Sequence, residues 1–258
     1  MNIVGLPALT ETYENYIWVL HKHNKAWVID PGESEQVLDY LNQHNLELQA
    51  ILITHKHHDH INGIQGILQR FESIDIYGPV NDQLDMVTIR CKEGDEITLD
   101  QELILKVVET PGHTPDHICF YNDEYLFSGD TLFTAGCGRI LGGTPEQYAQ
   151  SLLKLRALPD SLLFFCAHEY TDTNLRFAQL VEPNNIALQN RIEQTHICYP
   201  QIHIGAQSTL GLEKATNPFL RFDHENIQPH LTNRGAKDNS ADLFLKLREW
   251  KDEFDRQN

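Results

Sequence analysis

Short runs of β-branched and aromatic residues, separated by turn-forming residues, dominate the first two-thirds of the chain. Two early runs cover residues 16–20 and 26–29, and the second ends at Asp30-Pro31-Gly32, a turn signal. Runs of the same kind cover residues 50–54, 74–77, 103–109, 117–121, 125–128 and 161–167. Helices are expected at residues 34–41 and 148–158, where apolar positions recur at helical spacing. This alternation predicts an α/β domain.

The pattern changes near residue 172. Beyond it we predict helices at residues 174–181 and 184–197. A last helix is predicted because apolar residues at 243, 247, 250 and 254 fall on one face. We therefore expect an α/β domain over residues 1–172 and a smaller helical domain over residues 173–258.

Composition and charge exclude several classes of protein. The chain has 258 residues and a formal charge of −17, which repels phosphate backbones and argues against nucleic acid as a partner. No apolar run approaches the roughly 18 residues that a membrane span needs. The five cysteines are scattered without a Cys-x-x-Cys pair, which favours reduced thiols and a cytoplasmic protein. Nothing in the sequence demands more than a monomer.

Histidine is the unusual residue: four of the 14 fall between positions 55 and 60. His55, His57, Asp59 and His60 follow the apolar run at residues 50–54. Imidazole nitrogens and carboxylates are ligands for divalent transition metals. Because His55 and His57 lie two apart, an extended loop would turn both to one side, and the next two donors could face a second point. One loop could thus offer two ligands to each of two metals.

Three further donors, His113, Asp130 and His168, each follow a predicted strand. Loops at one end of a sheet are where functional sites collect in layered α/β folds. A lone histidine is usually a solvated side chain, but the combination favours a metal site. A structural zinc would favour cysteine ligands, and none joins the cluster. Asp30 is a candidate to orient a ligand imidazole, or else a turn residue before Pro31.

The spacing His-x-His-x-Asp-His, followed by the later His, Asp and His, resembles the metallo-β-lactamase superfamily over residues 15–170. Three later motifs look like glyoxalase II, the hydroxyacylglutathione hydrolase family: Gly136-Cys137-Gly138-Arg139, Ala167-His168-Glu169-Tyr170-Thr171 and Asn217-Pro218-Phe219-Leu220-Arg221. The predicted helical C-terminal domain, with Arg248-Glu249-Trp250-Lys251 near its end, also resembles this family. The resemblance implies an αββα sandwich with a metal site at one edge of its sheets, and a C-terminal helical domain.

The resemblance also implies residue roles. One divalent ion would be held by His55, His57 and His113, and another by Asp59, His60 and His168, with Asp130 bridging the two. Asp59 and Asp130 would be catalytic through these ions, which would be zinc, with iron or manganese as alternatives. Glutathione contacts would fall on Arg139, Tyr170, Arg248 and Lys251, with Asn174 as a further candidate. Leu141 departs from family members that have a tyrosine at this position.

The implied reaction is hydrolysis of an S-(2-hydroxyacyl)glutathione, S-D-lactoylglutathione above all, to glutathione and D-lactate. It would be the second step of methylglyoxal detoxification. A metal pair lowers the pKa of a shared water towards about 7, so that hydroxide can attack the thioester carbonyl.

Two alternatives remain open from sequence. A mononuclear iron glutathione persulfide dioxygenase would use the same fold and also handle glutathione. A non-catalytic metal-binding module would bind metal without turnover. The complete second ligand set and the helical extension favour the hydrolase, and a non-catalytic module would leave the basic pair Arg248 and Lys251 unexplained.

Overall fold

The chain forms two compact units. A computed structural model describes residues 1–198 and 207–257. Unit 1 comprises Met1–Glu109, Asp116–Asn122 and Phe127–Gly129. Unit 2 comprises Thr110–Pro115, Asp123–Leu126 and Asp130–Asn258.

Unit 1 contains a complete sheet in the order β1-β2-β3-β4-β5-β6. Its strands are β1 (Asn2–Ala8), β2 (Asn15–Lys22), β3 (Lys25–Ile29), β4 (Glu47–Leu52), β5 (Asp75–Pro79) and β6 (Ile89–Cys91). The first three strands are antiparallel, and β3 to β6 run parallel. Strand β4 is the short apolar run that leads into the histidine-rich loop, so a central parallel strand fixes the start of that loop.

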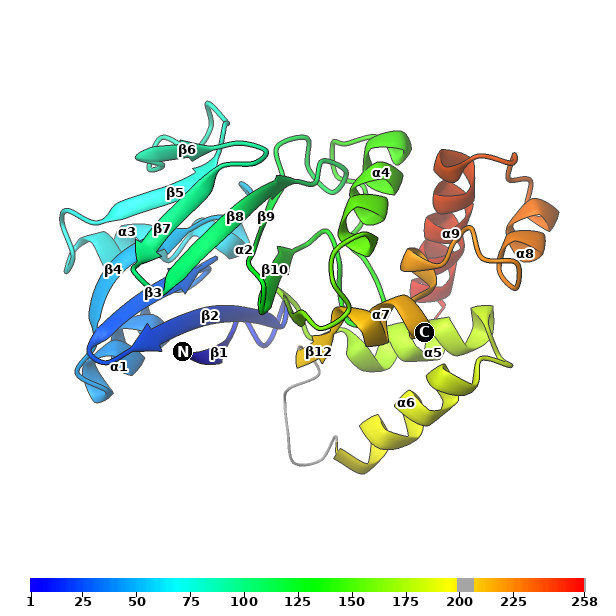
Figure 1. Cartoon of the computed structure of the whole chain (residues 1–258), viewed down its shortest axis with the longest axis horizontal. Helices are drawn as coiled ribbons and strands as arrows, with labels where there is room; N and C mark the ends of the chain where they lie inside the picture. Colours follow the sequence, from blue (N-terminus) through cyan, green and yellow to red (C-terminus); the bar gives the residue numbers. More distant parts are fainter. Residues whose placement is uncertain (199–206, 258) are drawn as a thin grey trace. The chain divides into compact units, whose positions relative to one another are not determined.

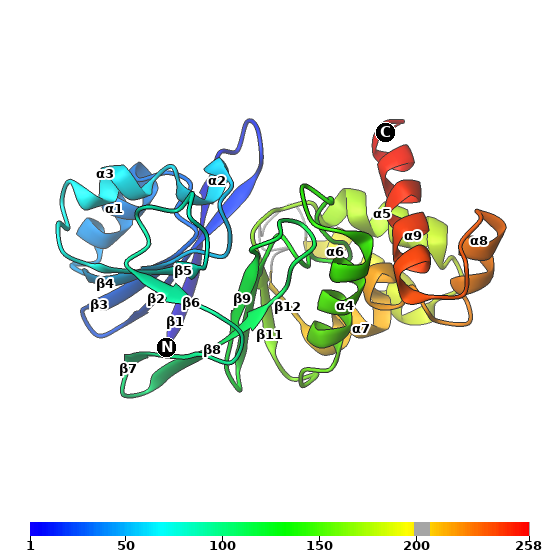
Figure 2. The ribbon, with the colours of Figure 1, turned by 90° about the horizontal axis from the view of Figure 1, so that it is seen from above.

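Helices cover one face of this sheet. They are α1 (Glu35–Gln43), α2 (His58–Ile61) and α3 (Ile64–Leu68), and Figure 2 shows α1 and α3 together on that face. Their apolar residues, such as Val37 and Ile67, share a core with Ile17, Val28 and Ile51 of the strands. These side chains are completely or almost completely buried, and each contributes about 1.5–3 kcal/mol by leaving water.

A second sheet has the order β12-β11-β10-β9-β8-β7, and its strands are divided between the two units. In chain order they are β7 (Glu96–Asp100), β8 (Leu103–Glu109), β9 (Ile118–Tyr121), β10 (Tyr125–Gly129), β11 (Leu163–Cys166) and β12 (Gln207–Thr209). In unit 1, β7, β8 and β9 pair antiparallel, and in unit 2 the same is true of β11 and β12.

The regular secondary structure of unit 2 is mainly helical. The helices are α4 (Pro145–Arg156), α5 (Thr171–Val181), α6 (Ile186–Cys198), α7 (Leu210–Thr216), α8 (Gln228–Asn233) and α9 (Ser240–Asp255), with the 3-10 turn η1 (Pro218–Leu220). Helix α4 begins with a capping box, in which the Thr144 side chain accepts from the Gln147 N–H and Gln147 bonds back to Thr144. Helix α9 packs against α4 and α8 (Figure 1).

The predicted elements are largely present, and the run at residues 103–109 coincides with β8. Strand β1 was missed because Gly5 and Pro7 interrupt its apolar pattern; it is an edge strand, where proline is tolerated. The three-residue strand β12 lies in a region that was expected to be helical, and pairing with β11 defines it.

Cys91, Cys119, Cys137 and Cys166 are buried free thiols, whereas the side chain of Cys198 lies outside the described part of the structure. Among residues 1–198 and 207–257, no helix is both long and apolar enough to cross a membrane.

Candidate metal centre

The histidine-rich loop of unit 1 begins three residues after β4. His57 precedes α2 with extended backbone (φ −64°, ψ 147°), and Asp59 and His60 lie in the first turn of that helix. His55 and His60 are completely buried. An extended segment followed by a helical turn therefore presents four donor side chains over six residues.

Asp30 orients His60. Its Oδ2 lies 2.9 Å from His60 Nδ1, and it also accepts hydrogen bonds from the N–H and Oγ1–H of Thr54. Because a carboxylate only accepts, His60 Nδ1 carries the ring proton and Nε2 presents its lone pair. That lone pair faces Asp59 Oδ2 at 3.3 Å, and two acceptors at this distance fit a cation between them.

His55 and His57 form a second pair of facing ring nitrogens. Thr54 Oγ1 gives its proton to Asp30, so it accepts from His55 Nδ1 at 3.1 Å and leaves Nε2 of that ring as an acceptor. His55 Nε2 lies 2.9 Å from His57 Nδ1. Two nitrogens bound to one tetrahedral zinc lie about 3.3 Å apart, given Zn–N bonds of about 2.0 Å, which is about 0.4 Å more than the observed 2.9 Å. A small outward shift of the two rings would therefore let them share one ion.

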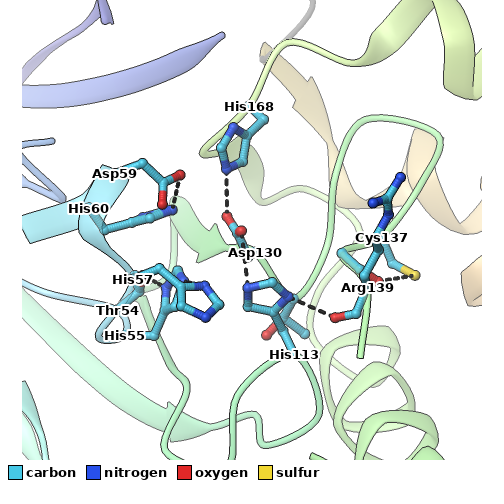
Figure 3. Close-up of polar contacts among 12 residues, drawn as sticks. Thr54, His55, His57, Asp59, His60, His113, Asp130, Cys137, Arg139 and His168 are labelled. Carbon is cyan, nitrogen blue, oxygen red and sulfur yellow. Dashed lines mark hydrogen bonds and ion pairs between the residues drawn. The ribbon is translucent and has the colours of Figure 1, made fainter. Parts of the chain in front are cut away.

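Unit 2 supplies three donors, each just beyond a strand. His113 follows β8, Asp130 follows β10 and His168 follows β11. The Asp130 carboxylate lies between the two rings, with Oδ2 at 3.3 Å from His113 Nε2 and Oδ1 at 3.1 Å from His168 Nε2 (Figure 3). Each carboxylate oxygen thus faces one imidazole, as in a bridging ligand.

The main-chain carbonyl of Arg139 fixes the tautomer of His113. This oxygen lies 2.7 Å from Nδ1 and can only accept, so Nε2 of the neutral ring directs a lone pair at the carboxylate of Asp130 (Figure 3). A cation between these groups satisfies both. In each unit, therefore, an imidazole lone pair faces a carboxylate oxygen, and a bound cation would satisfy both.

The substrate-binding candidates all lie in unit 2. Arg248 of α9 is 4% exposed, donates to the main-chain carbonyl of Cys137 at 3.0 Å and pairs with Asp252 at 3.0 Å. Arg139 also reaches Asp252, at 3.8 Å. Lys251 is equally buried and pairs with Asp255; burial lowers its pKa, and the ion pair opposes that shift.

Tyr170 stacks on His168, with ring centroids 5.0 Å apart and an interplanar angle of 4°. Asn174 donates to the main-chain carbonyl of Thr134 at 3.0 Å, so it supports the loop that contains Thr134.

His117 of unit 1 is buried and stacks on His55, with centroids 4.9 Å apart.

Asn15 was not anticipated from the sequence. It donates to Asp59 Oδ2 at 3.0 Å and to the Asp59 main-chain carbonyl at 3.2 Å. A single asparagine at a strand start carries no motif that could have revealed this contact.

Residues 10–168 match the metallo-β-lactamase superfamily, and residues 169–254 match the hydroxyacylglutathione hydrolase C-terminus. The hydroxyacylglutathione hydrolase of Hydrogenovibrio crunogenus is 46% identical over 264 residues, which cover 100% of this chain and 97% of that protein. The one from Aliivibrio fischeri strain MJ11 is 40% identical, covering 98% of this chain and 100% of that protein. The chain belongs to the hydroxyacylglutathione hydrolase family.

Solved structures agree with the fold. ETHE1 from Myxococcus xanthus matches with a TM-score of 0.69 and 24% identity, covering 96% of this chain and 90% of that chain, which shows the fold. TTHA1623 in a di-iron-bound form matches with a TM-score of 0.58 and 25% identity, covering 85% and 100%.

The chain has the predicted metallo-β-lactamase fold with a C-terminal helical domain. In this fold, its cluster of His and Asp donors fits a divalent metal site.

Proposed function

We propose that this protein hydrolyses S-(2-hydroxyacyl)glutathione thioesters, with S-D-lactoylglutathione as its substrate, to glutathione and the 2-hydroxy acid, here D-lactate. It would thereby catalyse the second step of methylglyoxal detoxification. Family membership makes the chain a hydrolase, and the observation that carries the proposal is 46% identity to a hydroxyacylglutathione hydrolase along the whole chain.

In this proposal two divalent ions occupy the centre. His55, His57 and His113 hold one, Asp59, His60 and His168 hold the other, and Asp130 bridges them. The support is chemical: in each unit, a ring nitrogen and a carboxylate oxygen that both accept face one another, and a cation between them satisfies both. Nitrogen and carboxylate ligands suit zinc, which we propose as the metal; iron and manganese are the alternatives that metal analysis distinguishes.

Such ions, when bound, polarise a carbonyl and lower the pKa of water to about 7. Asp59 and Asp130 provide the negative charge that retains the ions, and Asp30 and the Arg139 carbonyl hold the rings of His60 and His113 in the ligating tautomer. The leaving group is a thiolate whose acid has a pKa of about 8.5, so its departure requires no protonating residue.

The glutathione moiety binds Arg248, Lys251, Arg139 and Tyr170 in this proposal. A chain with a formal charge of −17 must supply local cations to hold substrate carboxylates. Arg248 and Lys251 lie three apart on α9 and supply two such charges.

We also place the functional boundary at residue 172, between a catalytic domain (1–172) and a substrate-binding domain (173–258).

The protein would act as a monomer in the cytoplasm. The buried free thiols support a reducing compartment, and the acidic charge argues against nucleic acid as a partner.

The decisive experiment is turnover of S-D-lactoylglutathione by the purified, metal-loaded protein, followed as loss of the thioester. We expect hydrolysis that stops after chelation and returns when metal is added back. No hydrolysis with two metals bound per chain would reject this substrate, and glutathione persulfide with oxygen would then test the dioxygenase alternative. Bound metal with neither activity would indicate a non-catalytic module.

Arg248→Ala should raise KM about 10- to 100-fold and change kcat about threefold or less. A charge-assisted hydrogen bond contributes about 1.5–3 kcal/mol, and Arg248 is proposed to bind a part of the substrate that does not react. Steady-state kinetics with S-D-lactoylglutathione measure both constants. Lys246→Ala on the same helix, which removes a partly exposed charge paired with Glu249, is the matched control and should change neither. Equal losses in kcat and kcat/KM would contradict a pure binding role.

A further inference from the structure

Helix α4 has two hydroxyl groups on its buried face, and neither belongs to the proposed ligand set. Tyr148 and Ser151 lie three residues apart on this helix and are 0% and 1% exposed. Both contact the backbone next to a proposed metal ligand of unit 2. The remaining buried positions of α4 include Leu152 and Leu155, which supply ordinary apolar packing.

The Tyr148 hydroxyl binds the backbone at Asp130. Its oxygen lies 2.9 Å from the main-chain carbonyl of Asp130 and 3.0 Å from that of Thr131, so its single proton is shared between two acceptors. Burial raises the pKa of Tyr148 well above its usual value, which keeps this donor protonated.

Ser151 binds the turn that carries His113. Its hydroxyl donates to the main-chain carbonyl of Pro111 at 2.7 Å. The next residue, Gly112, lies directly on Tyr148: a Cβ at this glycine would stand 2.6 Å from Tyr148 Cα and 2.4 Å from Cγ. Gly112 also has φ +155°, so the turn has both the backbone conformation and the close approach that glycine allows.

The two segments are also tied to each other. Thr131 donates to the Thr110 side chain at 2.9 Å, so the residue after Asp130 is bonded to the start of the His113 turn. The result is a closed set of contacts among α4, the turn 110–113 and the segment 130–131. Within it, His113 Nε2 and Asp130 Oδ2 lie 3.3 Å apart.

Packing alone does not explain these hydroxyls. Phenylalanine and alanine would occupy nearly the same space without the cost of burying a polar group. A buried hydroxyl that meets a carbonyl fixes the position of that carbonyl, and a ligand whose backbone is fixed keeps its geometry when the ion is absent.

We propose that Tyr148 and Ser151 are positioning residues, which hold the backbones on either side of the metal centre so that His113 and Asp130 are preset to share an ion. The inference rests on the proposed ligand roles of His113 and Asp130, although it does not depend on which thioester is the substrate.

The test compares Tyr148→Phe and Ser151→Ala with Tyr40→Phe as a matched control. Tyr40 loses the same hydroxyl, with its contact to His21 at 3.1 Å, but lies on α1, outside this set of contacts. Each full-length protein is stripped of metal and titrated with Co²⁺, both directly and against a competing chelator. The visible spectrum of bound Co²⁺ reports ligand geometry independently of turnover, and thermal unfolding is recorded for every variant.

We expect Tyr148→Phe to weaken Co²⁺ binding about tenfold or more and to change the Co²⁺ spectrum, with kcat falling more than KM rises. Ser151→Ala should act in the same direction by a smaller factor, and it decides the question if Tyr148→Phe fails to fold. Tyr40→Phe should match the wild type in spectrum and affinity.

Unchanged Co²⁺ spectra and affinities within about twofold of wild type in both α4 variants would overturn the proposal, whatever their stability. Failure of the wild type to bind Co²⁺ would also overturn it, together with the proposed metal centre. Normal Co²⁺ binding without hydrolysis of S-D-lactoylglutathione would reject only the substrate, since the spectral and affinity comparisons would still decide the role of α4.

Discussion

Asp130→Asn is expected to lower kcat/KM for S-D-lactoylglutathione about a thousandfold, which corresponds to about 4 kcal/mol of transition-state stabilisation. The Asp130 carboxylate places one oxygen at each of two imidazole edges, 3.3 Å from His113 Nε2 and 3.1 Å from His168 Nε2. Asparagine has the same shape but no charge, and one of its two terminal atoms is a donor. One imidazole would therefore face an N–H, and the centre would lose the anion proposed to bridge both ions.

Metal content per chain and steady-state kinetics should be measured on the same preparation. Asp172→Asn serves as the matched control, because it removes a partly exposed carboxylate paired with Arg176 on α5 and should leave both quantities unchanged. An Asp130→Asn protein that retains two ions and full turnover would refute the assignment of Asp130 as a ligand.

Glu213→Ala is expected to reduce the free energy of unfolding by about 3–5 kcal/mol. Glu213 on α7 is completely buried and pairs with Arg191 of α6, whose side chain is 5% exposed. It also accepts from the main-chain N–H of Ala135 at 2.9 Å and from the Asn217 side chain at 3.2 Å. Truncation leaves a buried guanidinium without its counter-ion and the Ala135 N–H without its acceptor, whereas the Asn217 amide keeps the carbonyls of Phe133 and Gly136.

Denaturant and thermal unfolding measure this loss, which corresponds to roughly 6–20 °C in Tm for a chain of this size. Glu193→Ala on α6 removes an exposed carboxylate and is the matched control, with an expected change within about 0.5 kcal/mol. Glu213→Gln keeps the shape and loses the charge, so it should fall between the two. A Glu213→Ala protein as stable as the wild type would show that Arg191 finds another counter-ion.

The sequence predicts the strands best where apolar runs are dense and buried. The run at 103–109 matches β8 because turns bound it on both sides. The histidine-rich loop could be recognised because four donors within six residues have no ordinary role in a loop. The role of Asn15 could not be predicted from the sequence, because it depends on a hydrogen bond to Asp59, which lies 44 residues further along the chain.

The helical region shows the limits of local pattern more clearly. The apolar positions of α4 predicted a helix with one buried face, yet they gave no sign that Tyr148 and Ser151 are bonded to backbone carbonyls on that face. The same applies to Glu213 and Arg191, 22 residues apart, which read as two solvated charges until the fold buries them together. Periodicity reports which face is buried, but partners distant in sequence require the structure.

The burial of the described thiols has a chemical consequence. Burial raises the pKa of Cys91 and Cys137 to about 11 and that of Cys166 to about 12. At pH 7 a thiol with a pKa of about 11 is ionised in roughly one molecule in ten thousand. Because these thiols are both buried and protonated, we expect them neither to capture an acyl group from a thioester nor to exchange with oxidised glutathione.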